Sequence, residues 1–257
     1  MKLLTTINNI LFKRPKMRKS RNVFLNNILS KDISDFKEIA MEMSEDLELH
    51  NLLKSNFESE NIDYSPQMDY SWPVVLYYII RKLKPKIFVE TGVWHGLSSV
   101  YILSAIKKNG KGKLISVDLP ALASSGGFDE INPFDSGDHI QLPEGKDPGW
   151  IVPNYLKENW TLRLGESKKL LPEIFSSNQV DIFLHDSDHS VSNMDFEFNL
   201  AYESLDKGYI FADNIHWNSS FNNFCKAHNL PPYSYYAYQE GPNLVGTFGG
   251  TKIDTKS

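Results

Sequence analysis

Oxygen-bearing side chains follow two neighbouring apolar runs of the sequence. Asp186 comes after the run 179–184, and Asp213 with Asn214 comes after the run 209–212. Carboxylate and amide oxygens on adjacent strand ends, completed by water and substrate oxygens, suit Mg²⁺ or a similar octahedral ion. The alternative is that the two aspartates cap the helices that follow them. Because three oxygen donors are expected to converge, we favour the metal site.

A histidine stands close to these groups. His189 lies three residues beyond Asp186. Imidazole titrates near neutral pH and is a competent general base for a substrate hydroxyl. The alternative is a histidine that only hydrogen-bonds the local turn. Four further histidines are rival bases, namely His95, His139, His185 and His216.

The stretch 86–99 joins an apolar run to a helical pattern through Gly92 and Gly96. A strand, a glycine turn and a helix together present unpaired N–H groups to a ligand, although two glycines can also simply turn the chain. The G-x-x-x-G spacing differs from the dinucleotide pattern and favours a nucleoside ligand without a pyrophosphate. Asp118, about 25 residues further on, can accept hydrogen bonds from both hydroxyls of a ribose, or can cap a turn. Trp94 and His95 lie inside the turn, and their roles stay open.

Composition narrows the classes of function. The 257 residues are 41% hydrophobic and carry a net charge of −5, which suits one α/β domain and argues against a nucleic-acid partner. The single cysteine, Cys225, excludes an intrachain disulfide and fits a reducing, cytoplasmic compartment. No apolar run is long enough to span a bilayer, and we expect no secretory signal. Residues 1–21 combine an apolar helical face (3–12) with a basic run (13–21), so they either dock on an anionic membrane surface or form a frayed or packed tail with a solvated basic face.

Periodicity predicts helices over 33–58 and 74–83, followed by regular alternation of strands and helices. A terminal hairpin, with its turn at 241–243, closes the pattern. This predicts an α/β fold with a doubly wound, mainly parallel sheet and an antiparallel edge. Ligands of such sheets bind beyond the carboxyl ends of the strands. The predicted regions are a basic extension (1–30), a helical region (31–70), a main domain (71–250) with a lid insertion (119–150), and a tail (251–257).

Five motifs occur in order: VETGVWHGLSS, ISVDLP, LGESKKLLP, DIFLHDSDHS and FADN. Together they resemble the class I S-adenosylmethionine-dependent methyltransferases over residues 70–250. The match is closer to the bacterial group with an HDSDHS-like motif and a PGW-x-VP segment, here 148–153. The resemblance implies a seven-stranded, Rossmann-like sheet whose last strand is antiparallel. It also implies a cofactor site formed by Glu90, Thr91, Gly92, Gly96, Ser98, Asp118, Leu119, Glu166, Ser167 and Asp186.

The metal-dependent catechol-type O-methyltransferases look similar over DIFLHD and ADN. This similarity implies a magnesium site at Asp186, Asp213 and Asn214. A lysine base of that group falls where this chain has His189. The expected function is therefore metal-assisted O-methylation of a small-molecule or glycan hydroxyl, with His189 and Asp186 catalytic. The alternatives are a silent S-adenosylmethionine-binding protein and, less favoured by the glycine spacing, a dinucleotide or nucleotide-sugar oxidoreductase.

Overall fold

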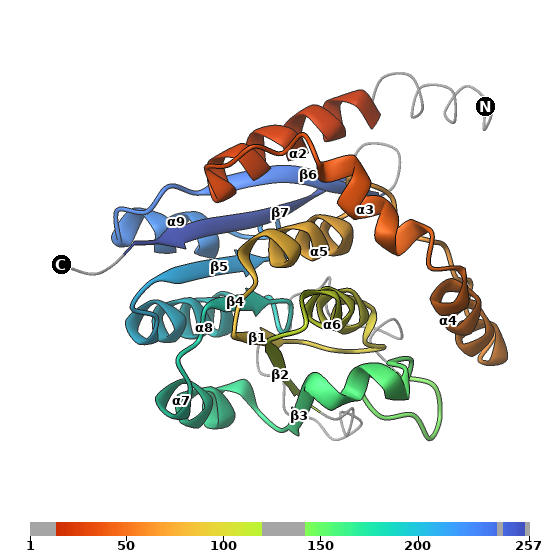
Figure 1. Cartoon of the computed structure of the whole chain (residues 1–257). Coiled ribbons are helices and arrows are strands. Elements are labelled where there is room, and N and C mark those ends of the chain that lie inside the picture. Colours follow the sequence, from red (N-terminus) through yellow and green to blue (C-terminus); the bar gives the residue numbers. More distant parts are fainter. Residues whose placement is uncertain (1–13, 120–141, 241–243, 255–257) are drawn as a thin grey trace.

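A seven-stranded sheet runs through the protein in the order β3-β2-β1-β4-β5-β7-β6 (Figure 1). The structure is a computed structural model, and it describes residues 14–119, 142–240 and 244–254. The predicted apolar face at 3–12, the hairpin turn 241–243 and most of the predicted lid lie outside these ranges. The strands are β1 (Ile87–Thr91), β2 (Lys113–Asp118), β3 (Trp160–Leu164), β4 (Ile182–His185), β5 (Gly208–Ala212), β6 (Tyr233–Glu240) and β7 (Leu244–Ile253).

Only β7 runs against its neighbours, because it pairs antiparallel with both β5 and β6, while the other strand pairs are parallel. The predicted seven-stranded, mainly parallel sheet with a reversed last strand is therefore confirmed. The reversed strand lies between β5 and β6, so the hairpin of β6 and β7 forms the antiparallel edge that the sequence predicts. Gly250 on β7 lets this strand lie next to β5, because a Cβ at this position would lie only 2.6 Å from the ring of Phe211 on β5.

Helices cover both faces of the sheet, as a doubly wound fold requires. One apolar core joins the sheet to the earlier helices, and a second joins it to the later ones. The first set is α2 (Arg14–Leu29), α3 (Phe36–Ser44), α4 (Leu47–Ser59), α5 (Trp72–Leu83) and α6 (Leu97–Asn109). The second set is α7 (Ser167–Ser177), α8 (Val191–Ser204) and α9 (Ser220–Ala227), and a 3₁₀ helix, η3 (Asn154–Asn159), precedes β3.

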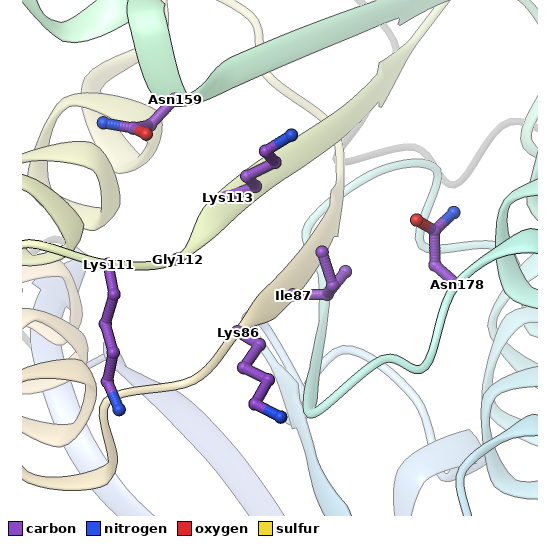
Figure 2. A pocket seen from close by; sticks show the side chains of 7 residues that line it. All are labelled: Lys86, Ile87, Lys111, Gly112, Lys113, Asn159 and Asn178. Carbon is purple, nitrogen blue, oxygen red and sulfur yellow. The ribbon is translucent and has the colours of Figure 1, made fainter.

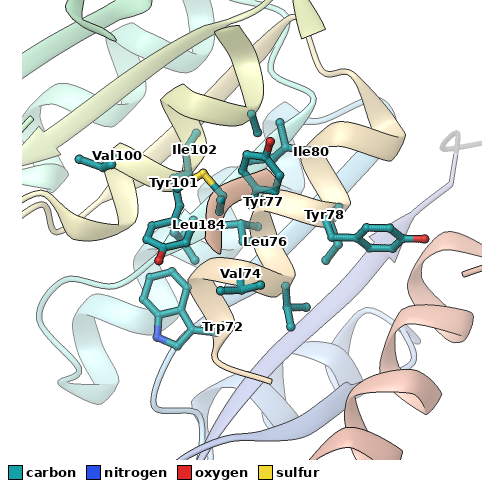
Figure 3. Packing of buried hydrophobic residues seen from close by; sticks show 14 of the residues in the cluster. Trp72, Val74, Leu76, Tyr77, Tyr78, Ile80, Val100, Tyr101, Ile102 and Leu184 are labelled. Carbon is teal, nitrogen blue, oxygen red and sulfur yellow. The ribbon is translucent and has the colours of Figure 1, made fainter. Parts of the chain in front are cut away.

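Helix α5 lies at the centre of the first core (Figure 3). Its residues are apolar on almost every side, and those from Trp72 to Ile80 are buried. A helix that is apolar all round must be covered on all sides. It is packed against α6, α3 and α2. Pro73 in its first turn and the left-handed Lys84 at its end set its limits, close to the predicted 74–83.

Two expectations for the N-terminal region were wrong. The predicted helix over 33–58 is broken into α3 and α4, because Asp46 accepts a hydrogen bond from the N–H of Leu49 (3.0 Å) and starts a new helix. The sequence pattern also predicts no helix over 14–29, where α2 lies. Pro15 lies in the first turn, where a missing N–H costs nothing. Figure 1 shows α2 lying along β6, and it buries Phe24 there.

Candidate functional site

The carboxyl ends of β1, β4 and β5 lie side by side. Thr91 pairs with His185, and His185 pairs with Ala212. The N–H of Asp186 donates to the carbonyl of Thr91 (3.0 Å), and the N–H of Asp213 donates to the carbonyl of His185 (3.1 Å). The structure therefore brings together the glycine turn (residues 92–96) and the two loops that begin at Asp186 and Asp213.

The glycine turn packs directly on the chain around it. Gly92 (φ +81°) and Gly96 (φ +100°) adopt left-handed conformations that favour glycine. A Cβ on Gly92 would lie 1.9 Å from the carbonyl oxygen of Asp186, and a Cβ on Gly96 would lie 2.7 Å from the Cα of Gly149. Both glycines are thus required by the approach of other backbone segments, whatever ligand the turn meets.

Asp118, at the end of β2, supports the turn. Its Oδ2 accepts hydrogen bonds from the N–H groups of Val93 and Trp94, both at 2.7 Å. Burial raises the pKa of this carboxyl, and the backbone N–H groups oppose that effect. The side chains of Leu119, the next residue, and of Trp94 are apolar and exposed. Asp118 therefore lies where the sequence predicted it, but it also shapes the turn.

Glu90 faces the interior, on the α6 side of β1. It is fully buried and accepts hydrogen bonds from Ser99 (2.5 Å) and Ser116 (2.7 Å), with Ser98 at 3.5 Å. Burial raises its pKa to about 7, although the serine hydroxyls act in the opposite direction. The side chains of Glu90 and Ser98 thus bond to each other beneath the turn.

Glu197 on α8 is the centre of a polar network that sequence reasoning missed. The carboxylate is fully buried and accepts from Thr91 Oγ1 (2.6 Å), Ser187 Oγ (3.1 Å) and Asn193 Nδ2 (3.2 Å). It also contacts His185 Nδ1 at 2.7 Å. Burial raises its pKa, but the interaction with His185 and the hydrogen bonds outweigh this and leave the pKa lowered. A signal existed in the sequence, because this acidic residue falls within the apolar stripe of a predicted helix.

The histidines divide into different roles. His189 is buried, with its ring against those of Trp217 (4.7 Å between centroids) and His185 (5.1 Å). His95 Nδ1 accepts from Trp150 Nε1 (2.9 Å), and burial lowers its pKa to about 4. His95 is therefore neutral at physiological pH and acts as an anchor for Trp150. Among the rival bases, His216 accepts from the N–H of Thr247 (3.3 Å), and His139 lies outside the described residues.

The PGW-x-VP segment docks on the turn. The N–H of Gly149 donates to the carbonyl of Trp94 (2.7 Å), and the N–H of Ile151 donates to the carbonyl of His95 (3.3 Å). Trp94 has a left-handed backbone (φ +49°), and 46% of its surface is exposed. The two residues that the sequence left open thus fasten the end of the long 119–150 stretch to the turn.

The predicted residues at the start of α7 are less enclosed. Glu166 forms an ion pair with Lys169 (2.7 Å) at the surface. Ser167 Oγ donates to Asn193 Oδ1 (3.3 Å), and Asn193 in turn donates to Glu197. Ser167 is therefore linked to the loop after β4, whereas Glu166 is not.

The metal prediction can be judged by its donor set. Within residues 14–119, 142–240 and 244–254, no group of three or more His, Cys, Asp or Glu side chains could hold a metal ion. The predicted set consists of two carboxylates and one amide, from Asp186, Asp213 and Asn214. Mg²⁺ is usually held by one or two carboxylates and keeps several waters. The donor set therefore fits a loosely held magnesium ion and does not form a closed cage.

A hollow of about 430 Å³ lies at the other end of the sheet (Figure 2). Its lining residues are Lys86, Ile87, Lys111, Gly112, Lys113, Asn159 and Asn178. Ile87 and Lys113 begin β1 and β2, so the hollow is at the amino ends of these strands. In Figure 2 the Lys113 side chain points away from those of Lys86 and Lys111, so the ammonium groups do not converge. The hollow is not part of the candidate site.

The part of the chain that the structure describes contains no helix long and apolar enough to cross a membrane.

Comparisons with known proteins point to one family. Residues 89–215 match a family described as a methyltransferase domain, Methyltransf_24. No curated protein matches the sequence. Among solved structures, a protein from Klebsiella pneumoniae provisionally described as an O-methyltransferase has a TM-score of 0.55 at 14% identity, over 80% of this chain and 90% of that chain. The O-methyltransferase TomG from Streptomyces achromogenes, solved with S-adenosylmethionine, has a TM-score of 0.51 at 11% identity, over 90% and 95%. Cofactor-bound Rv0187 from MTB has a TM-score of 0.52 at 10% identity, over 80% and 89%.

Proposed function

Because this chain is a class I S-adenosylmethionine-dependent methyltransferase, we propose that it methylates a hydroxyl oxygen of a small molecule or glycan. The observation that carries the proposal is the meeting of the glycine turn, Asp118 and the loop 186–189 at one edge of the sheet. TomG and the Klebsiella protein, which share the fold, are described as O-methyltransferases. This supports oxygen as the acceptor atom.

The cofactor would lie against the carboxyl ends of β1 and β2. The turn from Gly92 to Gly96 would border its methionine part, and Asp118 would accept hydrogen bonds from its ribose. The exposed apolar side chain of Leu119, next to that carboxylate, suits one face of the adenine, and Ser167 would border its edge. S-Adenosylmethionine supplies an electrophilic methyl group when it is bound. The chain's contribution is to hold the acceptor oxygen in line with that group.

Proton removal would fall to the loop after β4. His189 lies in this loop and would take the proton of the acceptor hydroxyl, while its ring packs against that of Trp217. Asp186, Asp213 and Asn214 would hold a magnesium ion, which lowers the pKa of a hydroxyl that binds it. Asp213 and Asn214 are buried, so these side chains are held in place before a ligand arrives.

Transfer of a radiolabelled methyl group to probe acceptors tests the proposal. A catechol, such as 3,4-dihydroxybenzoate, and a set of methyl glycosides sample the two acceptor classes. We expect transfer to at least one probe and loss of transfer with EDTA. Binding of S-adenosylhomocysteine without transfer to any probe, and with no effect of metal, would instead support a silent binding protein.

Three alanine variants separate the roles of the residues. Asp186→Ala and Asp213→Ala are expected to lower turnover about 100-fold or more and to change S-adenosylhomocysteine affinity little, since both act on the acceptor. Asp118→Ala is expected to weaken S-adenosylhomocysteine binding, as measured by calorimetry. An equal loss of cofactor binding in all three variants would contradict this division.

A further inference from the structure

Glu197 joins three parts of the site through one buried carboxylate. Thr91 comes from the end of β1, immediately before the glycine turn, and Ser187 comes from the loop that carries Asp186 and His189. Asn193 belongs to α8 itself. No atom of Glu197 is exposed, and its surroundings are otherwise the apolar core beneath α8. A lone carboxylate in such a core is costly unless it is fully hydrogen-bonded.

The position of a hydrogen on the neighbouring histidine follows from these contacts. Donors occupy both oxygens of Glu197, since Thr91 Oγ1 bonds to Oε2 while Ser187 Oγ and Asn193 Nδ2 bond to Oε1, so the carboxylate accepts at each contact. The His185 Nδ1 at 2.7 Å must then carry the hydrogen. In the neutral ring this leaves Nε2 as an acceptor, on the side of the ring away from Glu197. Nε2 is buried, and no described residue forms a hydrogen bond with it.

The sequence of α8 argues that the carboxylate has a role beyond filling space. Met194, Phe198 and Ala201 share its buried stripe, and an apolar residue at position 197 would continue this pattern. Replacing a buried charged network by apolar residues of similar volume is often neutral or stabilising. An apolar residue at position 197 could therefore serve the packing, and what the carboxylate adds is a set of hydrogen bonds that joins the β1 end to the β4 end.

We propose that Glu197 is a positioning residue for methyl transfer: it fixes His185 in the Nδ1–H tautomer and, through Thr91 and Ser187, holds the glycine turn against the loop of Asp186 and His189. This inference rests on the proposed function. Glu197 itself touches neither cofactor nor acceptor and acts through the groups that it holds.

The test is Glu197→Gln in the full chain, with Phe224→Leu as a matched control. Phe224 is a buried residue of the same core, 5.4 Å from Phe198, and its truncation removes packing but no polar contact. The readouts are long-range ¹⁵N–¹H correlation spectra of the histidine rings, with His185 assigned by its loss in His185→Gln, and calorimetry with S-adenosylhomocysteine. We expect Glu197→Gln to move His185 away from the single Nδ1–H tautomer and to weaken S-adenosylhomocysteine about tenfold.

Phe224→Leu is expected to lower the melting temperature but to leave the tautomer and the affinity within twofold of the wild type. A Glu197→Gln variant with an unchanged tautomer and unchanged affinity would overturn the inference. So would an affinity loss matched by Phe224→Leu, because that loss would reflect stability alone.

A variant that does not fold and a wild-type chain that does not bind the cofactor are distinguished by further measurements. If Glu197→Gln does not fold, Ser187→Ala and Thr91→Val each remove one donor to the carboxylate, and each is expected to weaken S-adenosylhomocysteine three- to tenfold. Unchanged affinity in both would overturn the inference. A wild-type chain that does not bind S-adenosylhomocysteine would refute the proposed function instead, while the His185 tautomer of wild type and variant would still report on Glu197.

Discussion

Gly92→Ala tests whether the glycine turn is required by packing. Gly110→Ala is its matched control, because Gly110 also has a positive φ (+65°) but has nothing within 4 Å of the methyl group that alanine would add. A left-handed alanine costs about 1–2 kcal/mol, and the stiffer unfolded chain returns about 0.4–1 kcal/mol. We therefore expect Gly110→Ala to cost about 1 kcal/mol, which lowers the melting temperature by about 2–4 °C in a chain of this size.

Gly92→Ala carries the same backbone cost and a steric one. The new Cβ would lie 1.9 Å from the carbonyl oxygen of Asp186 and 2.8 Å from the nitrogen of Ser187. Ordinary contact needs about 3.5 Å, so the backbone at Asp186 must move by about 1.5 Å. That movement strains the hydrogen bond from the N–H of Asp186 to Thr91, which costs about 1 kcal/mol. It also overpacks the turn, which costs about 1–3 kcal/mol. The sum is about 3–5 kcal/mol, which corresponds to a melting temperature lower by about 6–20 °C.

Thermal unfolding followed by circular dichroism measures both variants, and calorimetry with S-adenosylhomocysteine measures the state of the site. We expect Gly92→Ala to lose cofactor binding, because the clash with the Asp186 backbone also displaces the glycine turn that would border the cofactor. Gly110→Ala, at the far end of α6, should bind as the wild type does. Equal shifts of the melting temperature in the two variants would refute the claim that the approach of Asp186 is what demands glycine.

Three further predictions concern the core. Burial raises the pKa of Glu90 to about 7, so the folded state holds more protons than the unfolded state between about pH 4.5 and 7, and the stability from this group falls as pH rises through that window. Relative to wild type, Glu90→Gln should therefore gain up to about 3 kcal/mol of unfolding free energy between pH 5 and pH 8, and a constant difference would contradict this. The thiol of Cys225 is fully buried with its pKa raised to about 12 by burial, so it should react with a thiol reagent only in denaturant; rapid labelling of the native protein would count against the fold around α9. Phe24→Ala should cost about 3–5 kcal/mol in chemical denaturation, against less than about 0.5 kcal/mol for the exposed Val23→Ala, and a negligible cost would mean that α2 is a separate extension.

Most of the sheet was predictable because its signals are local. Each parallel strand is a short apolar run with polar residues at its end, and each helix between strands has its own periodicity. The position of β7 was not predictable in this way, because the hairpin pattern does not say which of its two strands pairs with β5. That choice depends on the fit of Gly250 beneath Phe211, a contact between residues far apart in the sequence.

The same distinction separates the predicted from the unpredicted parts of the site. The parallel pairing of β4 and β5 alone brings Asp186 and Asp213 together at the carboxyl ends of these strands, as the sequence analysis expects. The roles assigned to them and to His189 stay predictions. The Thr91–Glu197 hydrogen bond joins residues 106 positions apart, and no local pattern reports it. What the sequence did contain was an acidic residue on an apolar helical stripe, which is a signal for a buried polar network.

These contacts give a structural reason for the two glycines of the turn. Its G-x-x-x-G spacing favours a nucleoside ligand, yet the structure shows that Gly92 is required by the approach of the Asp186 backbone and Gly96 by that of Gly149. The glycines therefore report how tightly the turn is joined to the loop after β4 and to the PGW-x-VP segment. The choice of ligand is better sought in Asp118, whose carboxylate is held against the turn by two N–H groups. Since the turn is packed against both segments, we expect a substitution in either segment to weaken cofactor binding even where it leaves the rest of the fold intact.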